Sequence, residues 1–460
     1  MSVYSTSVAS DIIDPTFMSQ SRCEFRLQNR GQSYMTNMKL GGLGLNVAAA
    51  SGSVPYARGV GVAGIISRIR LMDAEMLLDE LRDVNSWMCF KSFLRSNAHA
   101  ADIDLPKAAG GGGRGFTSST SQIIESTPAM EPLATTDIDT SYGTLDLREV
   151  FPFLSTVKHL NTKVYKNLRV IIEWETNLSK SLQDTAAAAT KGTPILMVDE
   201  IMDAALVSAL DKDMLSAPVE FDAIEVDKMA LPEIPGIAAL PAAQLNDELQ
   251  QDVTLRANGF NGKFCKRMML QKMYSDASLL KNGTAVRGLG LNGSVAMHKE
   301  EINLRLNGRN VLAGAGINSP ARLAMSVADA YGDLNCVPYG HIESVGLDGG
   351  IAATAAVNCP AGVPITSPNV VVADEGEDVL AQQNALVGQY AYAGFVVHER
   401  AANLALRYVR SGHPQSTAAF PTGTTSARGG DSEGLTLSLW GEVVKTLTVN
   451  PDMSYRIDYM

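Results

Sequence analysis

Short segments with alternating apolar and polar residues dominate the sequence and constrain its fold more than any other feature. The clearest case is 164–176, where Val170, Ile172 and Trp174 share one face, as expected for a strand with one buried side. Asn29-Arg30-Gly31 and Asn307-Gly308 are strong turn signals between such segments. Many short strands joined by such turns indicate an all-β chain of sandwich or barrel domains. Strands are predicted at 23–28, 34–45, 65–71, 164–176, 194–200, 252–255, 264–273, 295–297, 302–306, 390–398, 403–410, 435–444, 446–449 and 454–459.

A few segments favour helices instead. Asp73 is typical of a helix N-cap, and an apolar stripe at helical spacing follows it, so we expect a helix of about 20 residues there. Trp87 lies beside the stripe and is expected to belong to the core. The stripe consists of Leu77, Leu81, Val84 and Met88. Shorter helices are predicted around 145–160 and at 320–331.

Four short matches recur in the same order in the two halves of the chain. They are Leu43–Asn46 with Leu289–Asn292, Arg68 with Arg305, Asn167-Leu168 with Asn403-Leu404, and Glu200 with Glu442, at offsets of 236 to 246 residues. Each match is weak alone, but their common order indicates two similar β domains in tandem. A stretch rich in proline and small residues separates the halves. We therefore expect an N-terminal segment (1–21), a first domain (22–228), a linker (229–251) and a second domain (252–460).

The composition limits the classes of function. Of the 460 residues, 45% are hydrophobic and only 19% charged, which excludes a disordered chain. The net charge of −11 argues against a large nucleic-acid-binding surface, which needs clustered Lys and Arg. So few charges on a chain of this size indicate that partners cover much of its surface.

Targeting and cysteine patterns favour a chain that is neither secreted nor held together by disulfides. The first twenty residues contain neither Lys nor Arg and no apolar run, so neither a secretory signal nor a membrane span is expected. The five cysteines form no C-x-x-C pair, which favours free thiols in a reducing compartment. The three glycosylation sequons, at Asn177, Asn282 and Asn292, are then chance matches.

No catalytic motif is convincing. Gly59–Gly64 and Gly288–Gly293 match G-x-G-x-x-G, but a strand rather than a helix is expected after each, so turn glycines are the better interpretation. His341 and Glu343 lack further metal ligands. Glu173 and Glu175 are expected to be a solvated strand face rather than a glycosidase pair, and the acidic run 374–378 an exposed loop. We therefore predict no enzyme, no cofactor and no metal site.

At this point the chain resembles a known family. Glu301–Leu312, followed by Gly316-Ile317 and 321–333, is similar to the second domain of major capsid proteins from polinton-like viruses and virophages. The pair Asn29–Gly31 and Asn37–Leu40, the helix-then-strand segment 145–176 and the closing 437–448 are also similar to that family.

The resemblance implies a double jelly-roll, in which two eight-stranded antiparallel sandwiches stand side by side with a few short helices in the connecting loops. It implies a major capsid protein of the adenovirus and tailless-phage lineage, whose homotrimers form pseudo-hexagonal capsomers of an icosahedral shell. Implied partners are neighbouring capsomers, penton and minor or cement proteins, but no sequence-specific nucleic acid; an internal membrane stays open. The implied location is the virion capsid, assembled inside the host cell. The loops 108–140 and 346–378 are candidates for outer contacts.

Two other functions remain as alternatives. A carbohydrate-binding or carbohydrate-active jelly-roll protein would need stacked aromatics in a cleft, and Trp174 is the residue to test. A nucleotide-dependent enzyme would use Gly59–Gly64, and nucleotides would then raise its thermal stability.

Overall fold

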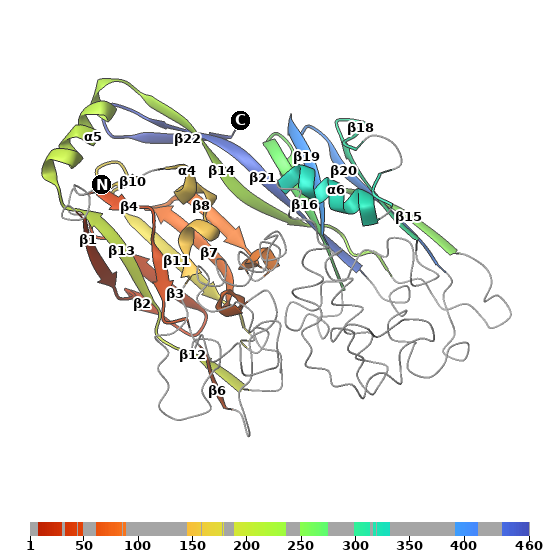
Figure 1. Ribbon diagram of the computed structural model, residues 1–460, viewed down its shortest axis with the longest axis horizontal. Helices are drawn as coiled ribbons and strands as arrows, with labels where there is room; N and C mark the ends of the chain where they lie inside the picture. The colour runs from red at the N-terminus through yellow and green to blue at the C-terminus, as the bar shows by residue number, and fades with distance from the viewer. Residues whose placement is uncertain are drawn as a thin grey trace, which may run out of the picture.

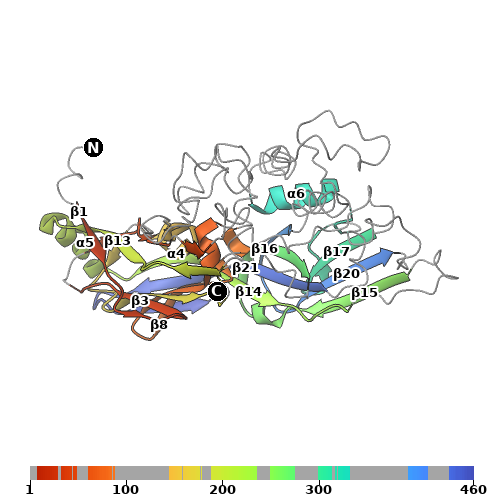
Figure 2. The same ribbon diagram turned by 90° about the horizontal axis from the view of Figure 1, so that it is seen from below.

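A computed structural model of the chain contains two β-sandwich units side by side along its long axis (Figures 1 and 2). The structure describes residues 8–29, 33–43, 45–48, 61–84, 86–88, 145–157, 159–176, 178, 188–235, 249–274, 299–312, 316–318, 320–331, 392–412 and 435–459.

The first unit consists of two facing antiparallel sheets and a small two-stranded ribbon. One sheet contains β1 (Val8–Ile13), β4 (Ser33–Met35), β5 (Lys39–Gly41), β9 (Leu145–Asp146), β10 (His159–Asn161) and β13 (Ile195–Ile201). The other, here called sheet B, contains β2 (Phe17–Met18), β3 (Arg22–Arg26), β7 (Ile66–Asp73), β8 (Met76–Arg82) and β11 (Leu168–Trp174). The ribbon pairs β6 (Leu45–Ala48) with β12 (Ala188–Lys191), and the helical segments are η1 (Gly61–Ile65), η5 (Leu147–Glu149), α4 (Pro152–Thr156) and α5 (Ala204–Ser216).

The second unit is built in the same way. Its larger sheet contains β14 (Val219–Ala230), β16 (Phe264–Tyr274), β19 (Tyr392–Arg400), β21 (Leu435–Val449) and β22 (Tyr455–Tyr459). Its smaller sheet contains β15 (Leu249–Arg256), β17 (Lys299–Leu306), β18 (Arg309–Asn310) and β20 (Leu404–Gly412). The turn η8 (Asn258–Phe260) and helix α6 (Pro320–Tyr331) complete it.

The strand order repeats between the units. In the larger sheets, β1–β13–β4–β10 corresponds to β14–β21–β16–β19; in the smaller, β3–β11–β7–β8 corresponds to β15–β20–β17–β18. The helices α4 and α6 also hold equivalent places, each before the strand pair β10–β11 or β19–β20. Two chain segments with one topology support the duplication inferred from the sequence.

The four repeated sequence matches do not all fall at equivalent positions of the two units. Glu200 pairs with β1 and β4, and Glu442 pairs with the equivalent strands β14 and β16. Leu168 and Leu404 both begin their strands opposite the last residue of the neighbouring strand. Arg68 and Arg305 lie in equivalent strands but differ in register, because Arg305 is one residue from its strand end and Arg68 is five. Residues 289–292 lie outside the described residues.

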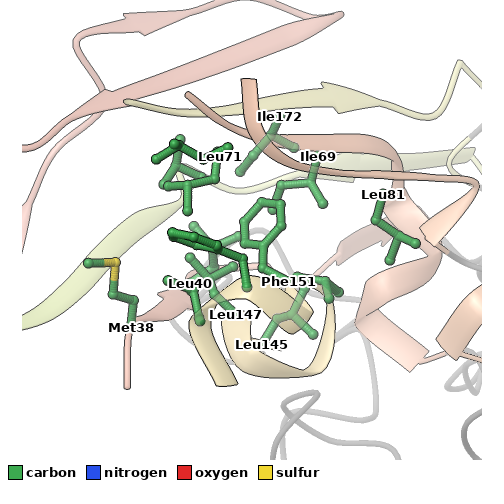
Figure 3. Close-up of a cluster of buried hydrophobic side chains, with 14 of the residues drawn as sticks. Met38, Leu40, Ile69, Leu71, Leu81, Leu145, Leu147, Phe151 and Ile172 are labelled. Atoms are coloured by element: carbon green, nitrogen blue, oxygen red, sulfur yellow. The ribbon is translucent and has the colours of Figure 1, made fainter. Parts of the chain in front are cut away.

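Alternation along the strands builds the cores. In the first unit Ile69, Leu71 and Ile172 point inward between the sheets, where Leu147 and Phe151 from the η5–α4 segment meet them (Figure 3). In the second unit Leu304, Leu406 and Tyr408 face Leu270 and Phe395 in the same manner, and all five are fully buried. Each core therefore follows directly from the period-two pattern.

The helix predicted to begin at Asp73 is wrong over its first half. Residues 76–82 form β8, which pairs with β7 through a tight turn at Ala74 (φ 51°), and helical backbone begins only at Val84. Leu81 faces the core, but a register shift between Leu71 and Met72 puts Leu77 opposite Met72 on the outer side, and Leu78 is buried in its place. Pairing with β7 decided between helix and strand. The predictions of Trp87 in the core, of helix 320–331 and of the Asn307-Gly308 hairpin turn are confirmed.

The strand pairing also differs from the expected domain boundaries. β1 lies within the expected N-terminal segment, yet it pairs along its whole length with β13 of the first unit. β14 lies at the end of the expected first domain, yet all twelve of its residues pair with β21 of the second unit. The chain therefore changes units at α5, ahead of the proline-rich stretch.

Candidate functional site at the junction of the two sandwiches

The second unit reaches over the first through a three-stranded extension made of β14, the end of β21 and β22. β21 has fifteen residues, roughly 50 Å of extended chain. Its first part pairs with β16, whereas Lys445–Val449 pairs with β22, so its neighbour changes at Lys445. Leu439 belongs to the second core, but Leu447 and Val449 belong to the first. The extension lies along the first unit in Figure 1.

A fully buried lysine lies where β21 changes its neighbour from β16 to β22. The Lys445 side chain is 0% exposed, and its Nζ lies 2.7 Å from Glu225 Oε2 of β14. The same Nζ donates a hydrogen bond to the Leu78 carbonyl oxygen of β8, in the first unit. Tyr459 of β22 donates to Glu225 Oε2 as well, at 3.1 Å. The Lys445 ammonium group thus ties β21 and β14 to the first unit, and β22 joins them through the Glu225 carboxylate.

A second buried carboxyl group, Asp79, stands beside this pair. Its oxygens accept backbone hydrogen bonds from Glu80 and from Phe153, the latter at the start of α4, each at 2.9 Å. Burial raises the pKa of Asp79 from 3.8 to about 7; Lys445 opposes this shift and the Glu225 charge adds to it. The Lys445 ammonium group pairs with Glu225 and acts on Asp79 only through its charge, so a proton on Asp79 makes the cluster neutral.

Two stacked indole rings form a second contact between the units. The indole rings of Trp87, from the first unit, and Trp440, from β21, are stacked with centroids 5.6 Å apart. The Lys228 ammonium lies 4.7 Å from the Trp440 ring centroid and also pairs with Asp83, which precedes the Trp87 helical turn. Stacked rings and buried ion pairs require defined geometry. The junction can therefore hold the two sandwiches at one fixed angle.

The Asp79 proton predicts a measurable pH dependence. Because its folded pKa lies above the unfolded value, the stability it supplies is complete below about pH 4 and is lost as pH rises toward 7. Relative to Asp79→Asn, the wild-type free energy of unfolding should fall by up to about 1.4 kcal/mol per pH unit between pH 5 and 7, then level off. Urea unfolding at a series of pH values measures this difference.

Glu225→Gln is the companion variant. Burial still raises the Asp79 pKa in this variant, but the contribution of the Glu225 charge is gone, so the fall should end at a lower pH than in the wild type. Equal pH slopes in the wild type and Asp79→Asn would contradict the assignment.

Among the described residues, none of the predicted chemical motifs forms a site. Gly64 lies in η1, which leads into strand β7 and not into the α-helix that a dinucleotide site needs. Glu173 pairs with Arg70 at 2.5 Å and with Arg68 at 3.7 Å, so it belongs to an ion-pair network on sheet B. Trp174 is 4% exposed and has Lys191 over its ring, which leaves no face for a sugar.

The other candidates lie outside the described residues or form no cluster. Gly288–Gly293, His341, Glu343, the acidic run 374–378 and both outer-loop candidates fall outside the described ranges. Among the residues that the structure does describe, no three His, Cys, Asp or Glu side chains could hold a metal ion. In the same ranges no helix is long and apolar enough to cross a membrane. Cys23 and Cys265 are buried free thiols.

Sequence reasoning missed the junction cluster, although one signal was present. Lys445 occupies the face of β21 that also carries Val443, Leu447 and Val449, so a lysine interrupts an otherwise apolar row. Such an interruption marks a buried charge only when a partner is known to be near. Asp79 and Leu78, which supply that environment, are 366 or more residues away in the sequence. The sequence predicted a helix at these two residues, so a strand beside Lys445 was not expected.

Comparisons with known proteins identify the fold. A scan against protein-family models gives no match, and no curated protein sequence matches the chain. Solved structures do match over nearly the whole chain. The major capsid protein of mavirus has a TM-score of 0.51 at 8% identity, covering 98% of this chain and 90% of that one. A chain of the Sputnik virophage structure gives 0.50 at 8%, covering 98% and 88%.

VP54 of PBCV-1, fitted into a reconstruction of the Sputnik virophage, gives a TM-score of 0.51 at 10% identity and covers 98% of this chain and 97% of that one. The similarity extends through both sandwiches in each case. The double jelly-roll fold predicted from the sequence is therefore confirmed.

Proposed function

We propose that this chain is a major capsid protein, a structural subunit without catalytic activity that forms homotrimers in the shell of a virion. The observation that carries the proposal is the likeness to the mavirus major capsid protein, which spans both sandwiches and nearly all of each chain. Sheet topology alone would fit many functions. The match in the number, order and side-by-side placement of two sandwiches is far more specific.

The repeated topology supports a ring of six sandwiches. Within one chain, β14 of the second unit packs against β8 and α4 of the first. By strand order, β1 is the first-unit equivalent of β14, and α6 is the second-unit equivalent of α4. If the same contact repeats between chains, β1 of one copy meets α6 of the next. Three copies then close a ring, as expected for a heterologous contact with cyclic symmetry.

Exposed apolar side chains lie on these two surfaces. Ile12 on β1 is 62% exposed, and so is Met325 on α6. Both are large apolar residues that a protein contact would remove from water. We propose that units 8–201 and 219–459, joined by α5, alternate around the ring. Neighbouring capsomers, penton proteins and minor or cement proteins are the further partners in this proposal.

Mass measurement tests the trimer. Light scattering during gel filtration should give a mass near three times 49.0 kDa, roughly 150 kDa. Ile12→Asp and Met325→Asp should each shift the protein toward the monomer, because a charge enters an apolar contact. Met76→Asp, at the exposed β7–β8 turn outside both surfaces, is the matched control. A wild-type monomer at micromolar concentration would contradict the proposal.

A further inference from the structure

The outer side of sheet B is strongly basic although the chain as a whole is acidic. The five strands of this sheet contain six arginines and no lysine. Three glutamates lie on the same side, whereas Asp73 and Asp79 of these strands are buried. The outer side therefore has a surplus of three positive charges, on a chain with a net charge of −11. The arginine face, as we call it, consists of Arg22, Arg26, Arg68, Arg70, Arg82 and Arg169 with Glu24, Glu80 and Glu173.

The cross-strand register places arginines opposite one another and leaves one of them without a counter-charge. Arg169 lies directly opposite Arg26, and Arg68 directly opposite Arg82. Like charges in direct opposition destabilise a sheet unless a counter-charge lies between them. Glu80 bridges Arg68 and Arg82, and Glu24 pairs with Arg169. Arg26 is exposed and has no ion pair among the described residues.

The choice of arginine over lysine points to a protein contact. Arginine is enriched and lysine depleted at protein–protein interfaces, because the planar guanidinium group is more weakly hydrated and binds carboxylates in a bidentate manner. The side chains of Arg70 and Arg169 are each 21% exposed, so they lie flat on the sheet. The Nε groups of Arg22, Arg70 and Arg169 are buried without an acceptor in the described part of the chain.

A complementary acidic surface lies on the extension of the second unit. Asp222, Thr446 and Asp458 form one cross-strand row, and Glu220 follows in the next row beside Thr448. The three carboxylates are exposed, and Arg456 in the next row pairs with one of them, Asp458. We call Glu220, Asp222 and Asp458 the acidic edge. Asp222 and Asp458 lie two strands apart, a distance of about 10 Å. The strands that carry Arg26 and Arg70 are also two strands apart.

The acidic edge cannot reach the arginine face of its own chain. Phe221, Leu447 and Ile457 on the opposite side of the extension pack against the first core, so the acidic edge points away from the first unit. We propose that the arginine face binds the acidic edge of a second copy of this chain. The two surfaces differ, so the contact is heterologous and each copy can use both.

Charge exchange tests the pairing. Arg26→Glu and Asp222→Arg should each weaken self-association about tenfold at low salt, and the double variant in one chain should restore it. Wild-type association should also weaken between about 0.05 and about 0.5 M salt, as exposed charges are screened. Sedimentation velocity gives the distribution of species for each protein. Arg26 and Asp222 are both exposed, so circular dichroism should show unchanged folding.

The outcomes separate this inference from the proposed trimer, on which it rests for its biological context. Lys212→Glu on α5 changes the net charge equally and should leave association unchanged. Failure of the double variant to restore association would overturn the pairing while a 150 kDa trimer could persist. Binding of a labelled DNA oligonucleotide that Arg26→Glu abolishes, with no change in self-association, would assign the face to nucleic acid and also overturn it.

Discussion

Replacing Lys445 by methionine is expected to lower the free energy of unfolding by about 3–5 kcal/mol, although the new side chain has nearly the same length. The substitution leaves Glu225 with a buried charge whose ammonium partner is gone, and Asp79 beside it. The Leu78 carbonyl oxygen also loses its donor. Removing one partner of a buried pair costs far more than the pair contributes, because the remaining charge keeps its full desolvation penalty.

Urea unfolding followed by circular dichroism measures the change in the free energy of unfolding. Arg456→Met on β22 is the matched control, because that arginine is 67% exposed and pairs with an exposed Asp458, so its loss should change stability by less than about 0.5 kcal/mol. Adding Glu225→Gln to Lys445→Met should recover part of the loss. A loss no larger than in the control would show that the junction tolerates an unpaired carboxylate, contrary to the burial seen here.

Truncating Trp440 to alanine is expected to cost about 3–5 kcal/mol. The side chain is fully buried, stacks on Trp87 and lies under the Lys228 ammonium group. It belongs to β21 of the second unit but lies in the core of the first, so the cavity opens between the units. The variant should therefore weaken both units, and hydrogen exchange should increase in β8 as well as in β21.

Trp440→Phe is the companion variant. It keeps an aromatic ring against Trp87 and should lose less than half as much stability as the alanine variant. Increased exchange confined to β21 in the alanine variant would contradict a shared core. The three Trp residues of the chain include both junction indoles, so fluorescence reports the opening directly.

Local patterns determined the strands because each strand buries one face. Ile69 and Leu71 alternate with arginines, Val170 and Ile172 are two residues apart in β11, and the sheets place all four inward as expected. The turn at Asn307-Gly308 was equally readable, since both residues adopt the positive φ that a two-residue hairpin requires (51° and 85°). These features depend on neighbours within a few residues, so no knowledge of the fold is needed.

Features that depend on distant partners were not readable. The segment after Asp73 carries apolar spacing compatible with a helix, and only pairing with β7 makes it a strand. The boundary between units was misplaced because β14 is attached to the first unit by sequence but paired to β21, more than 200 residues later. Long-range pairing outweighs local propensity in β structure, because the partner strand supplies the hydrogen bonds.

The sequence by itself therefore determined the fold class, the duplication and the inward faces of the strands. Tertiary structure alone decided how the two copies are joined: Lys445 binds Glu225 and Leu78, and Trp440 stacks on Trp87, across more than 200 residues of sequence in every case. The reason is physical. Alternation is set by water on one side of a strand, whereas a junction is set by the groups that happen to meet after both sandwiches have formed.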